Sequence, residues 1–307
     1  MKEPFEISQN VKAALNRNAP VIALESTVIA HGLPGNAGVK AALSMIREAD
    51  KEGCVAAVIG IVKGKVKIGL SEEEIVRFAH SGDALKVSTR EIASAIVAKR
   101  DGATTVAATA YIAANAGILI MATGGIGGVH RGVSESWDIS ADLWELVKTP
   151  SVVVCSGPKA VLDLGLTLEW LETHQVPVYG YETDELPAFY SPHSGLKVPR
   201  LDAPKDVLAL YTTRLGVGQK SGMVIAVPIP EKDAIDVQEP IDQAVKSAKE
   251  KGISGPALTP WLLAKIQESY GEKAVDANVA LLINNARIAA KIAVELCSSS
   301  DKRIGFH

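Results

Sequence analysis

Residues 20–25 read Pro20-Val21-Ile22-Ala23-Leu24-Glu25, an uninterrupted apolar run that ends in a carboxylate. A continuous run of this length is typical of a strand buried on both faces of a parallel sheet. Further apolar runs occupy residues 118–122, 151–155, 176–180 and 223–227, with helical stretches between them. This alternation predicts the α/β class, with a mainly parallel sheet covered by helices.

Capping residues and chain breakers predict the elements between these runs. Ser71-Glu72-Glu73-Glu74 has the form of a capping box and predicts a helix to about His80. Lys63-Gly64-Lys65 predicts the turn of a hairpin over residues 55–70. We expect the remaining helices at residues 39–52, on both sides of Gly102, and at residues 140–147, 160–173 and 279–296.

Composition excludes several classes of protein. The chain has 307 residues, of which 47% are hydrophobic and 22% charged, so it is neither disordered, collagen-like nor a disulfide framework. Its formal net charge is −3 and it contains no basic block, so we expect no nucleic-acid partner. Cys54, Cys155 and Cys297 lie far apart without a CxxC pair, which favours a reducing, cytoplasmic location and argues against a cysteine-ligated zinc site.

The sequence also bears on membranes and on domain number. The uncharged stretch 102–129 is long enough to span a bilayer, but it is broken at residues 115–117 and ends in glycines. We therefore expect no membrane association, and the polar start over residues 1–6 does not resemble a secretory signal. Residues 182–205 carry four prolines and could be a domain linker or a functional loop. Because no composition shift separates the halves, we predict a single domain over residues 1–307.

Chemically unusual side chains lie at or near the expected ends of strands, where ligands bind in parallel sheets. Glu25 directly follows a buried run, and its desolvation is costly unless the carboxylate is paired or functional. The alternative is that Glu25 caps a helix or lies in a solvated loop. Lys86 precedes Val87-Ser88; by itself this is a weak signal, because most lysines are solvated.

A glycine-rich segment, residues 123–132, follows another expected strand. Glycines let backbone amides approach an anion, and His130 and Arg131 add donors. The alternative is a set of tight turns beneath a packed helix. The spacing does not match the dinucleotide-binding pattern. Shortly afterwards, Asp138 and Asp142 could together hold a hard divalent cation, whereas Ser140 could simply cap the next helix.

Lys159 ends the segment Ser156-Gly157-Pro158-Lys159, and we expect it in the first turn of a helix. A cation is unfavourable there because the helix dipole favours anions, so the lysine is either exposed or used as a neutral nucleophile. With Glu25, Lys86 and the glycine segment, it suggests lysine-dependent chemistry at a carbonyl-like carbon of a phosphorylated small molecule.

The sequence resembles the pseudouridine-5′-phosphate glycosidases over nearly its whole length. The matching segments are residues 23–32, 86–88, 101–107, 122–132, 138–143, 156–159, 180–183, 228–230 and 284–286. One departure is Leu33-Pro34-Gly35-Asn36, where family members usually have a slightly longer proline-rich segment.

The resemblance implies an α/β/α sandwich, assembled as a homotrimer, that acts in pseudouridine catabolism. The family reversibly cleaves the C–C glycosidic bond of pseudouridine 5′-phosphate to give uracil and ribose 5-phosphate. By resemblance, Glu25 is the proton donor, Lys159 is the nucleophile that forms an imine, and Asp138 binds Mn²⁺. The substrate contacts implied in the same way are Lys86, Val106, Ser140, Ala141 and Asp142, with Thr123 and His130 at the phosphate or ribose and Asn278 at the uracil.

Two other classes of function remain open from the sequence. A relative could run the bond-forming direction as a C-glycosyl transferase that attaches ribose 5-phosphate to another aromatic acceptor. The chain could also be a phosphosugar-binding protein without catalysis, although the presence of both Glu25 and Lys159 argues against this.

Overall fold

The computed structural model describes residues 5–253 and 258–298, so the polar residues 1–4 of the expected start lie outside it. The strands are β1 (Phe5–Ile7), β2 (Val21–Leu24), β3 (Val55–Val62), β4 (Lys65–Ile68), β5 (Leu85–Val87), β6 (Gly102–Thr104), β7 (Ile120–Ala122), β8 (Val129–His130), β9 (Val152–Cys155), β10 (Leu162–Asp163), β11 (Val178–Tyr181), β12 (Arg200–Leu201) and β13 (Met223–Ala226). The α-helices are α1 (Gln9–Asn16), α2 (Asn36–Lys51), α3 (Glu72–His80), α4 (Ile92–Val97), α5 (Val106–Asn115), α6 (Val133–Ser136), α7 (Ala141–Lys148), α8 (Leu164–Thr173), α9 (Pro204–Gly216), α10 (Gln238–Glu250), α11 (Leu258–Tyr270) and α12 (Glu272–Ser298).

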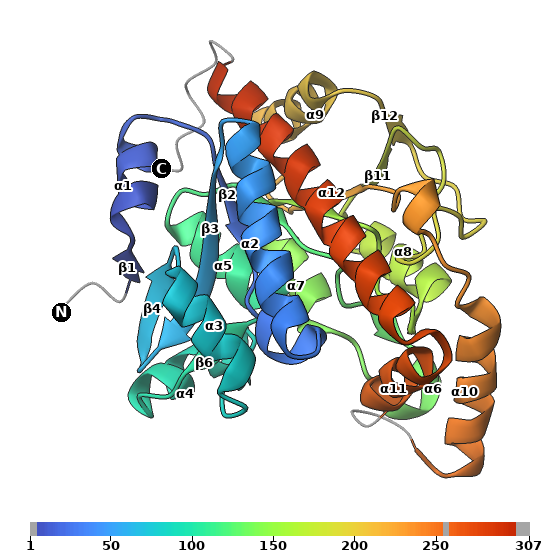
Figure 1. The fold of residues 1–307 in the computed structure, drawn as a ribbon. Coiled ribbons are helices and arrows are strands. Elements are labelled where there is room, and N and C mark those ends of the chain that lie inside the picture. The colour runs from blue at the N-terminus through green and yellow to red at the C-terminus, as the bar shows by residue number, and fades with distance from the viewer. Residues whose placement is uncertain (1–4, 254–257, 299–307) are drawn as a thin grey trace.

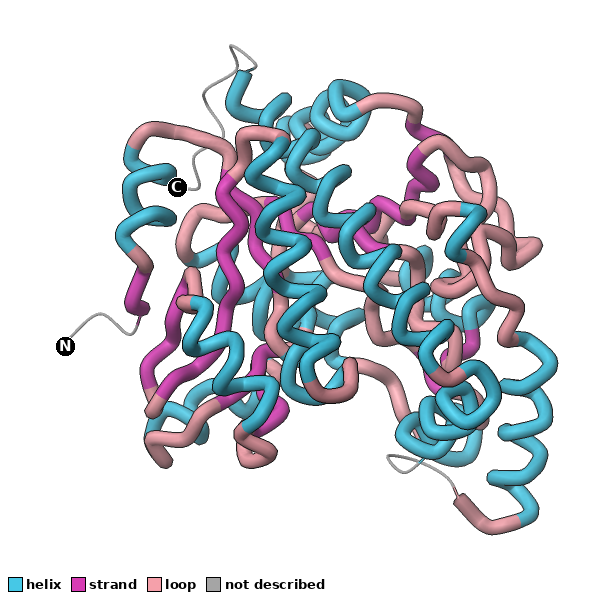
Figure 2. The backbone as a smooth tube through the Cα atoms, viewed as in Figure 1, coloured by secondary structure: helices cyan, strands magenta, loops and turns pink. Residues whose placement is uncertain are grey.

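One twisted sheet runs through the molecule (Figures 1 and 2). Its strand order is β1-β4-β3-β2-β7-β9-β13-β11-β12, and β5 and β6 extend it from β3. The pairings from β3 through β2, β7, β9, β13 and β11 to β12 are parallel, whereas β3 pairs antiparallel with both β4 and β6. The carboxyl ends of β2, β7 and β9 therefore meet at one edge of the sheet, as expected for a mainly parallel arrangement.

The sheet separates two hydrophobic cores, because successive side chains of a strand point to opposite faces. In β2, Ile22 and Leu24 belong to one core, whereas Val21 and Ala23 belong to the other. Helices α2, α9 and α12 cover the first face, and α5, α7 and α8 cover the second (Figure 1). The predicted α/β class and the three-layer α/β/α sandwich are confirmed.

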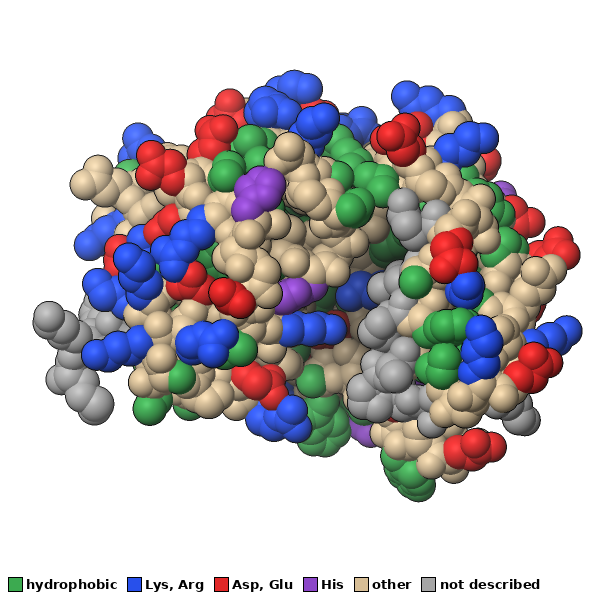
Figure 3. All heavy atoms as spheres, turned by 60° about the horizontal axis from the view of Figure 1, so that its bottom comes forward, with side chains coloured by type: hydrophobic (Ala, Val, Ile, Leu, Met, Phe, Trp, Pro, Cys, Tyr) green, Lys and Arg blue, Asp and Glu red, His purple; other side chains and the backbone are tan. Residues whose placement is uncertain are grey.

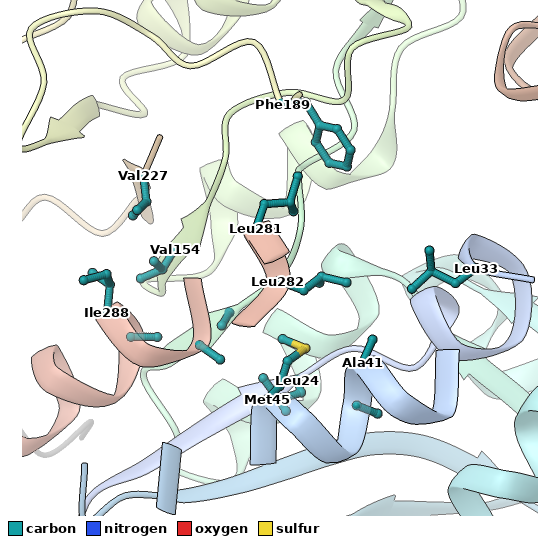
Figure 4. Packing of buried hydrophobic residues seen from close by; sticks show 14 of the residues in the cluster. Leu24, Leu33, Ala41, Met45, Val154, Phe189, Val227, Leu281, Leu282 and Ile288 are labelled. Carbon is teal, nitrogen blue, oxygen red and sulfur yellow. The ribbon is translucent and has the colours of Figure 1, made fainter. Parts of the chain in front are cut away.

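The long helix α12 packs beside α2 across the middle of the sheet (Figure 1). Figure 4 shows Leu282 and Ile288 of α12 in the same apolar cluster as Leu24 of β2 and Met45 of α2. All four side chains are at most 5% exposed. This packing fixes α12 against the strands that bear the site, so that polar side chains from its first half reach the carboxyl ends of those strands.

The local predictions hold at most elements. The capping box at Ser71 and Glu74 starts α3, and Lys63-Gly64-Lys65 lies at the turn between β3 and β4. The uncharged stretch 102–129 forms β6, α5, β7 and the glycine segment, so it is divided among short elements. In the part of the chain that the structure describes, no helix is both long and apolar enough to cross a bilayer.

Candidate active site

A cavity of about 140 Å³ lies at the carboxyl ends of β2, β7 and β9. Its wall contains five of the residues expected to act on or contact substrate, namely Glu25, Lys86, Thr123, Lys159 and Asn278. It also contains Thr27, Val28, His31, Gly32, Gly124, Gly125, Ala160, Val161, Phe189, Tyr190 and Ile266. Figure 3 shows this side of the molecule hollowed, with lysine or arginine and histidine side chains at the hollow.

A second cavity of about 360 Å³ lies at the opposite edge of the sheet, near the start of β2 and β7. Its wall is mainly apolar, with Leu15, Val21, Leu119 and Ile120 among its residues. The described residues that line it include no carboxylate, lysine or histidine. It is the larger space, but the acid–base chemistry lies in the first cavity.

Glu25 lies in the first cavity with both carboxyl oxygens engaged. Thr27 donates its hydroxyl to Oε2, and Thr123, which follows β7, donates its hydroxyl to Oε1. The residue is only 5% exposed. Because a hydroxyl can accept a hydrogen bond as well as donate one, both threonines can remain partners whether or not Glu25 carries a proton. The alternative that Glu25 caps a helix or lies in a solvated loop is therefore wrong.

The backbone that carries Glu25 is anchored by its neighbour. Ser26 is fully buried, and its Oγ accepts a hydrogen bond from the backbone N–H of Thr104 at 2.8 Å. The Thr104 hydroxyl in turn donates to the carbonyl of Ile59 at 2.7 Å and accepts from the hydroxyl of Thr109 at 2.9 Å. These bonds join the ends of β2, β3 and β6 and hold the acid in place.

Lys159 lies in an extended loop after β9, and the prediction that it occupies the first turn of a helix is wrong. Helix α8 begins later, at Leu164, with Asp163 as its N-cap. The backbone N–H of Lys159 instead donates to the carbonyl of Ile126 at 3.0 Å, and β10 pairs with β8. Pro158 forms a bridge with Ile126, residues 160 and 161 form a turn, and β10 pairs with β8, so the segment that carries Lys159 lies beside the glycine segment and is not helical.

The glycine segment packs closely against its neighbours, and part of it lines the cavity. The amides of Thr123, Ile126, Gly127 and Val129 all donate to acceptors within the protein. A Cβ on Gly125 would lie 2.6 Å from the Phe189 ring, so glycine is required by close packing at this position. Gly124 and Gly125 do line the cavity. The four paired amides serve the packing of the segment, whereas an anion cradle at Gly124 and Gly125 stays a prediction.

Positive charge gathers near the cavity around Lys86 at β5. Burial lowers the pKa of His130, and the positive charges of Lys86 and Lys159 lower it further, whereas the Asp138 carboxylate opposes this shift. Partial burial and the charge of Lys86 likewise lower the pKa of His31. The three electrostatic couplings put Lys86, Lys159 and the two imidazoles in one neighbourhood, which suits a dianionic phosphate.

The expected metal ligand, Asp138, lies beside His130, with 3.6 Å between the carboxylate Oδ2 and the imidazole Nδ1. Over residues 5–253 and 258–298, no group of three or more histidine, cysteine, aspartate or glutamate side chains could hold a metal ion. One carboxylate with a neighbouring imidazole fits only a hard divalent ion that takes most of its ligands from water or substrate oxygen.

Five of the expected substrate contacts are absent from the described cavity wall: Val106, His130, Ser140, Ala141 and Asp142. Ser140 is the N-cap of α7 and accepts from the Asp142 amide, as the capping alternative predicted. Asp142 is 6% exposed, and its carboxylate accepts from the amides of Ala107 and Gly127, each at 2.8 Å. The carboxylate thereby joins the start of α5 to the glycine segment, which gives Asp142 a structural role, and its pairing with Asp138 at a cation stays a prediction.

Sequence reasoning missed an aromatic part of the wall. Phe189 and Tyr190 come from the proline-containing loop after β11, and their rings make an edge-to-face contact with centroids 4.7 Å apart. Burial raises the pKa of Tyr190 to about 12, and a hydrogen bond with Asn278 opposes this shift. The length of this loop was the one sequence signal for the aromatic wall. Thr27 and His31, by contrast, belong to the segment after β2 that was singled out together with Glu25.

The chain is similar to known proteins over nearly its whole length. Residues 10–295 match a family described as indigoidine synthase A like protein. Pseudouridine-5′-phosphate glycosidase 2 of Photorhabdus laumondii is 48% identical over 294 residues, which is 94% of each chain. The pseudouridine-5′-phosphate glycosidase of Clostridium botulinum is 46% identical over 96% of this chain and 98% of its own.

Two solved structures are similar throughout. A prealnumycin C-glycosynthase in complex with ribulose 5-phosphate superposes with a TM-score of 0.91 at 36% identity, covering 97% of this chain and 98% of that one. An indigoidine synthase A like protein from Thermotoga maritima gives a TM-score of 0.85 at 36% identity, with 95% and 96% coverage.

Proposed function

The chain belongs to the indigoidine synthase A like family, and on that premise we propose that it is a pseudouridine-5′-phosphate glycosidase. It cleaves the C–C glycosidic bond of pseudouridine 5′-phosphate reversibly, giving uracil and ribose 5-phosphate. The near-full-length identity to two glycosidases supports this activity. The observation that carries it is the presence of both Glu25 and Lys159 in one cavity at the carboxyl ends of the parallel strands.

The residue types fit the problem that a carbon leaving group presents. An ordinary glycosidase protonates a leaving oxygen, but the uracil carbon has no lone pair and must receive its proton on the ring. The uracil ring first donates electron density to form a C5=C1′ double bond, while the C1′–O4′ bond breaks and O4′ leaves with its electron pair and takes up a proton as the 4′-hydroxyl. The neutral amine of Lys159 then adds to C1′.

Glu25 delivers its proton to uracil C5 as the C–C bond breaks. The bonding electrons stay with uracil until that proton arrives, and C1′ remains bound to Lys159 as a protonated imine. Water hydrolyses the imine, which releases ribose 5-phosphate and returns the amine. The threonine hydroxyls on Glu25 support this role because they can remain partners in either protonation state.

The remaining groups bind and orient the substrate. Lys86, with His31 and His130 nearby, supplies positive charge for the phosphate, and Asn278 reads the uracil from the Tyr190 side of the cavity. Asp138 and His130 would hold a manganese-type ion, which neutralises phosphate charge when bound. The proposal includes a homotrimer in the cytoplasm.

The decisive experiment follows uracil release from pseudouridine 5′-phosphate by ultraviolet absorbance, with pseudouridine itself as the matched substrate. Charge-assisted hydrogen bonds contribute roughly 1.5–3 kcal/mol each, so loss of the phosphate should lower kcat/KM by at least about two decades. Equal efficiency on the two substrates would contradict the assigned phosphate site. No uracil release at all would contradict the function.

A second candidate deserves a test because the C-glycosynthase superposes so closely. In that case the chain joins ribose 5-phosphate to an aromatic acceptor other than uracil. A screen with ribose 5-phosphate and several aromatic acceptors separates the two: product formed with uracil favours the glycosidase, and product formed only with another acceptor favours the transferase.

A further inference from the structure

Asn285 is a fully buried amide on α12 that reaches the ends of two strands. Its Nδ2 donates to the carbonyl of Thr123 at 2.8 Å and to the carbonyl of Gly124 at 3.4 Å. The same nitrogen lies 3.1 Å from the hydroxyl of Ser156, which is 3.3 Å from the Asn285 Oδ1. One side chain therefore contacts the loop after β7 and the loop after β9.

These two loops carry the two halves of the proposed chemistry. Thr123 donates its hydroxyl to Glu25, and Ser156 starts the segment that ends at Lys159. The loops also meet directly, since the Ser156 amide donates to the Gly124 carbonyl at 2.8 Å and the Lys159 amide donates to the Ile126 carbonyl at 3.0 Å. Asn285 joins them at their base, where each loop leaves its strand.

We propose that Asn285 is a positioning residue that sets the placement of the Lys159 amine relative to the Glu25 carboxyl. The inference rests on the proposed function. A purely packing role would be met by an apolar side chain, because burial of an amide costs free energy unless its groups are paired. Here the Asn285 amide donates to the carbonyls of Thr123 and Gly124, which follow β7. The loop that holds Thr123 therefore cannot move independently of α12.

The expected effect is on catalysis more than on binding. A misplacement of about 1 Å between reacting groups can cost about 100-fold in rate. We expect Asn285→Ala to lower kcat for uracil release by about 100-fold, with the KM for pseudouridine 5′-phosphate changed little, because Lys86 and Asn278 keep their places in the cavity wall. Borohydride trapping of ribose 5-phosphate on Lys159 should slow with kcat.

Asn284→Ala is the matched control. Asn284 is the adjacent amide on the same helix, and it bonds outside the cavity: its Nδ2 donates to the Pro228 carbonyl at 3.2 Å and its Oδ1 accepts from Arg287 at 2.8 Å. This variant also loses two hydrogen bonds, which are partly buried, but it should keep kcat within about twofold of wild type. A role in stability alone would affect both variants alike.

Ser156→Ala keeps the test decisive if Asn285→Ala does not fold, as judged by circular dichroism. It removes one hydroxyl from the same group and leaves the Asn285 bonds to the two carbonyls, so we expect a smaller fall in kcat, about 10-fold. When the wild type is active, the positioning role is overturned if folded Asn285→Ala has the kcat of Asn284→Ala. Where Asn285→Ala does not fold, it is overturned if Ser156→Ala has that kcat. A rise in KM with kcat unchanged also overturns the positioning role. Wild type that releases no uracil is a separate result, which overturns the proposed function and this inference with it.

Discussion

Glu25 is buried, yet both of its oxygens have hydroxyl partners, and this determines what its replacement should do. In Glu25→Gln the amide keeps a similar shape between Thr27 and Thr123 but has no proton to give to the uracil carbon. General acid catalysis contributes about 10²–10⁴-fold, so kcat for uracil release should fall by at least about 100-fold. Ribose 5-phosphate should still form a trapped adduct on Lys159, which controls for folding. Turnover near the wild-type rate would contradict the assignment of the acid.

Lys159 should form a covalent imine with the ribose carbon. An imine can be reduced whereas an ordinary hydrogen bond cannot, so borohydride with ribose 5-phosphate should leave a stable pentose phosphate adduct on Lys159. Peptide mass spectrometry locates it. Lys159→Ala should abolish both adduct and uracil release while substrate still binds, since Lys86 and Asn278 remain in the wall. An adduct on Lys86 would show that the nucleophile has been assigned to the wrong lysine.

Asp138 provides a carboxylate for a divalent ion beside His130. Chelation should lower activity, manganese should restore it, and Asp138→Ala should blunt that rescue, because water alone holds the ion weakly. Electron paramagnetic resonance of free Mn²⁺ measures binding independently of turnover. Glu135→Ala, an exposed carboxylate on nearby α6, is the control and should leave Mn²⁺ binding unchanged. Full activity of thoroughly chelated wild type would exclude an essential ion.

Among the elements, the glycine segment and α5 depend on the Asp142 carboxylate. Asp142→Ala leaves the buried amides of Ala107 and Gly127 without their acceptor. Since hydrogen bonds to charged groups contribute roughly 1.5–3 kcal/mol each, the free energy of unfolding should fall by about 3 kcal/mol or more in urea titrations. Asp163→Ala removes a carboxylate that accepts from the single amide of Leu166 and should cost about 1 kcal/mol. Equal losses in the two variants would contradict the account of Asp142.

The elements that the sequence predicted well are those whose signal is local. The run at residues 20–24 is buried on both faces as β2, and the capping box at Ser71 starts α3. Strand β6 was missed because it begins at Gly102, and glycine is depleted in strands. The loop of Lys159 was misassigned because residues 160–162 are apolar enough to continue a helix, whereas residues 160 and 161 form a turn, β10 pairs with β8, and α8 begins only at Leu164.

The site could be predicted only in part for a related reason. Glu25 was visible because a carboxylate directly after an apolar run is rare. The resemblance pointed to Lys86 and Asn278, whose positions in the cavity wall no local pattern could give. Phe189 and Tyr190 reach the wall from a loop, and which loop residues point inward is decided by tertiary packing alone.

For the molecule as a whole, the imidazoles of His130 and His31 make stability depend on pH. The pKa values of His130 and His31 are lowered from 6.5, chiefly by burial, so the unfolded chain takes up protons there before the folded protein does. The free energy of unfolding should therefore fall as the pH drops below about 6.5 and level off below the folded-state pKa values. Urea titrations at about pH 7.5 and 5.5 measure the fall, which should be smaller in His130→Gln. An equal fall in that variant would assign the effect to other groups.

The cavity wall draws on residues from widely separated parts of the chain, and α12 is the last described helix to contribute to it. The chain is synthesised from its N-terminus, and a domain generally folds as a unit. Lys159 is translated well before Asn278 and Asn285, so for part of that time its loop lacks the helix that holds it. A nascent chain therefore carries the Lys159 amine before it has the helix that positions this amine for attack on a sugar aldehyde. Catalytic competence therefore requires that α12 has been synthesised and has packed against the sheet.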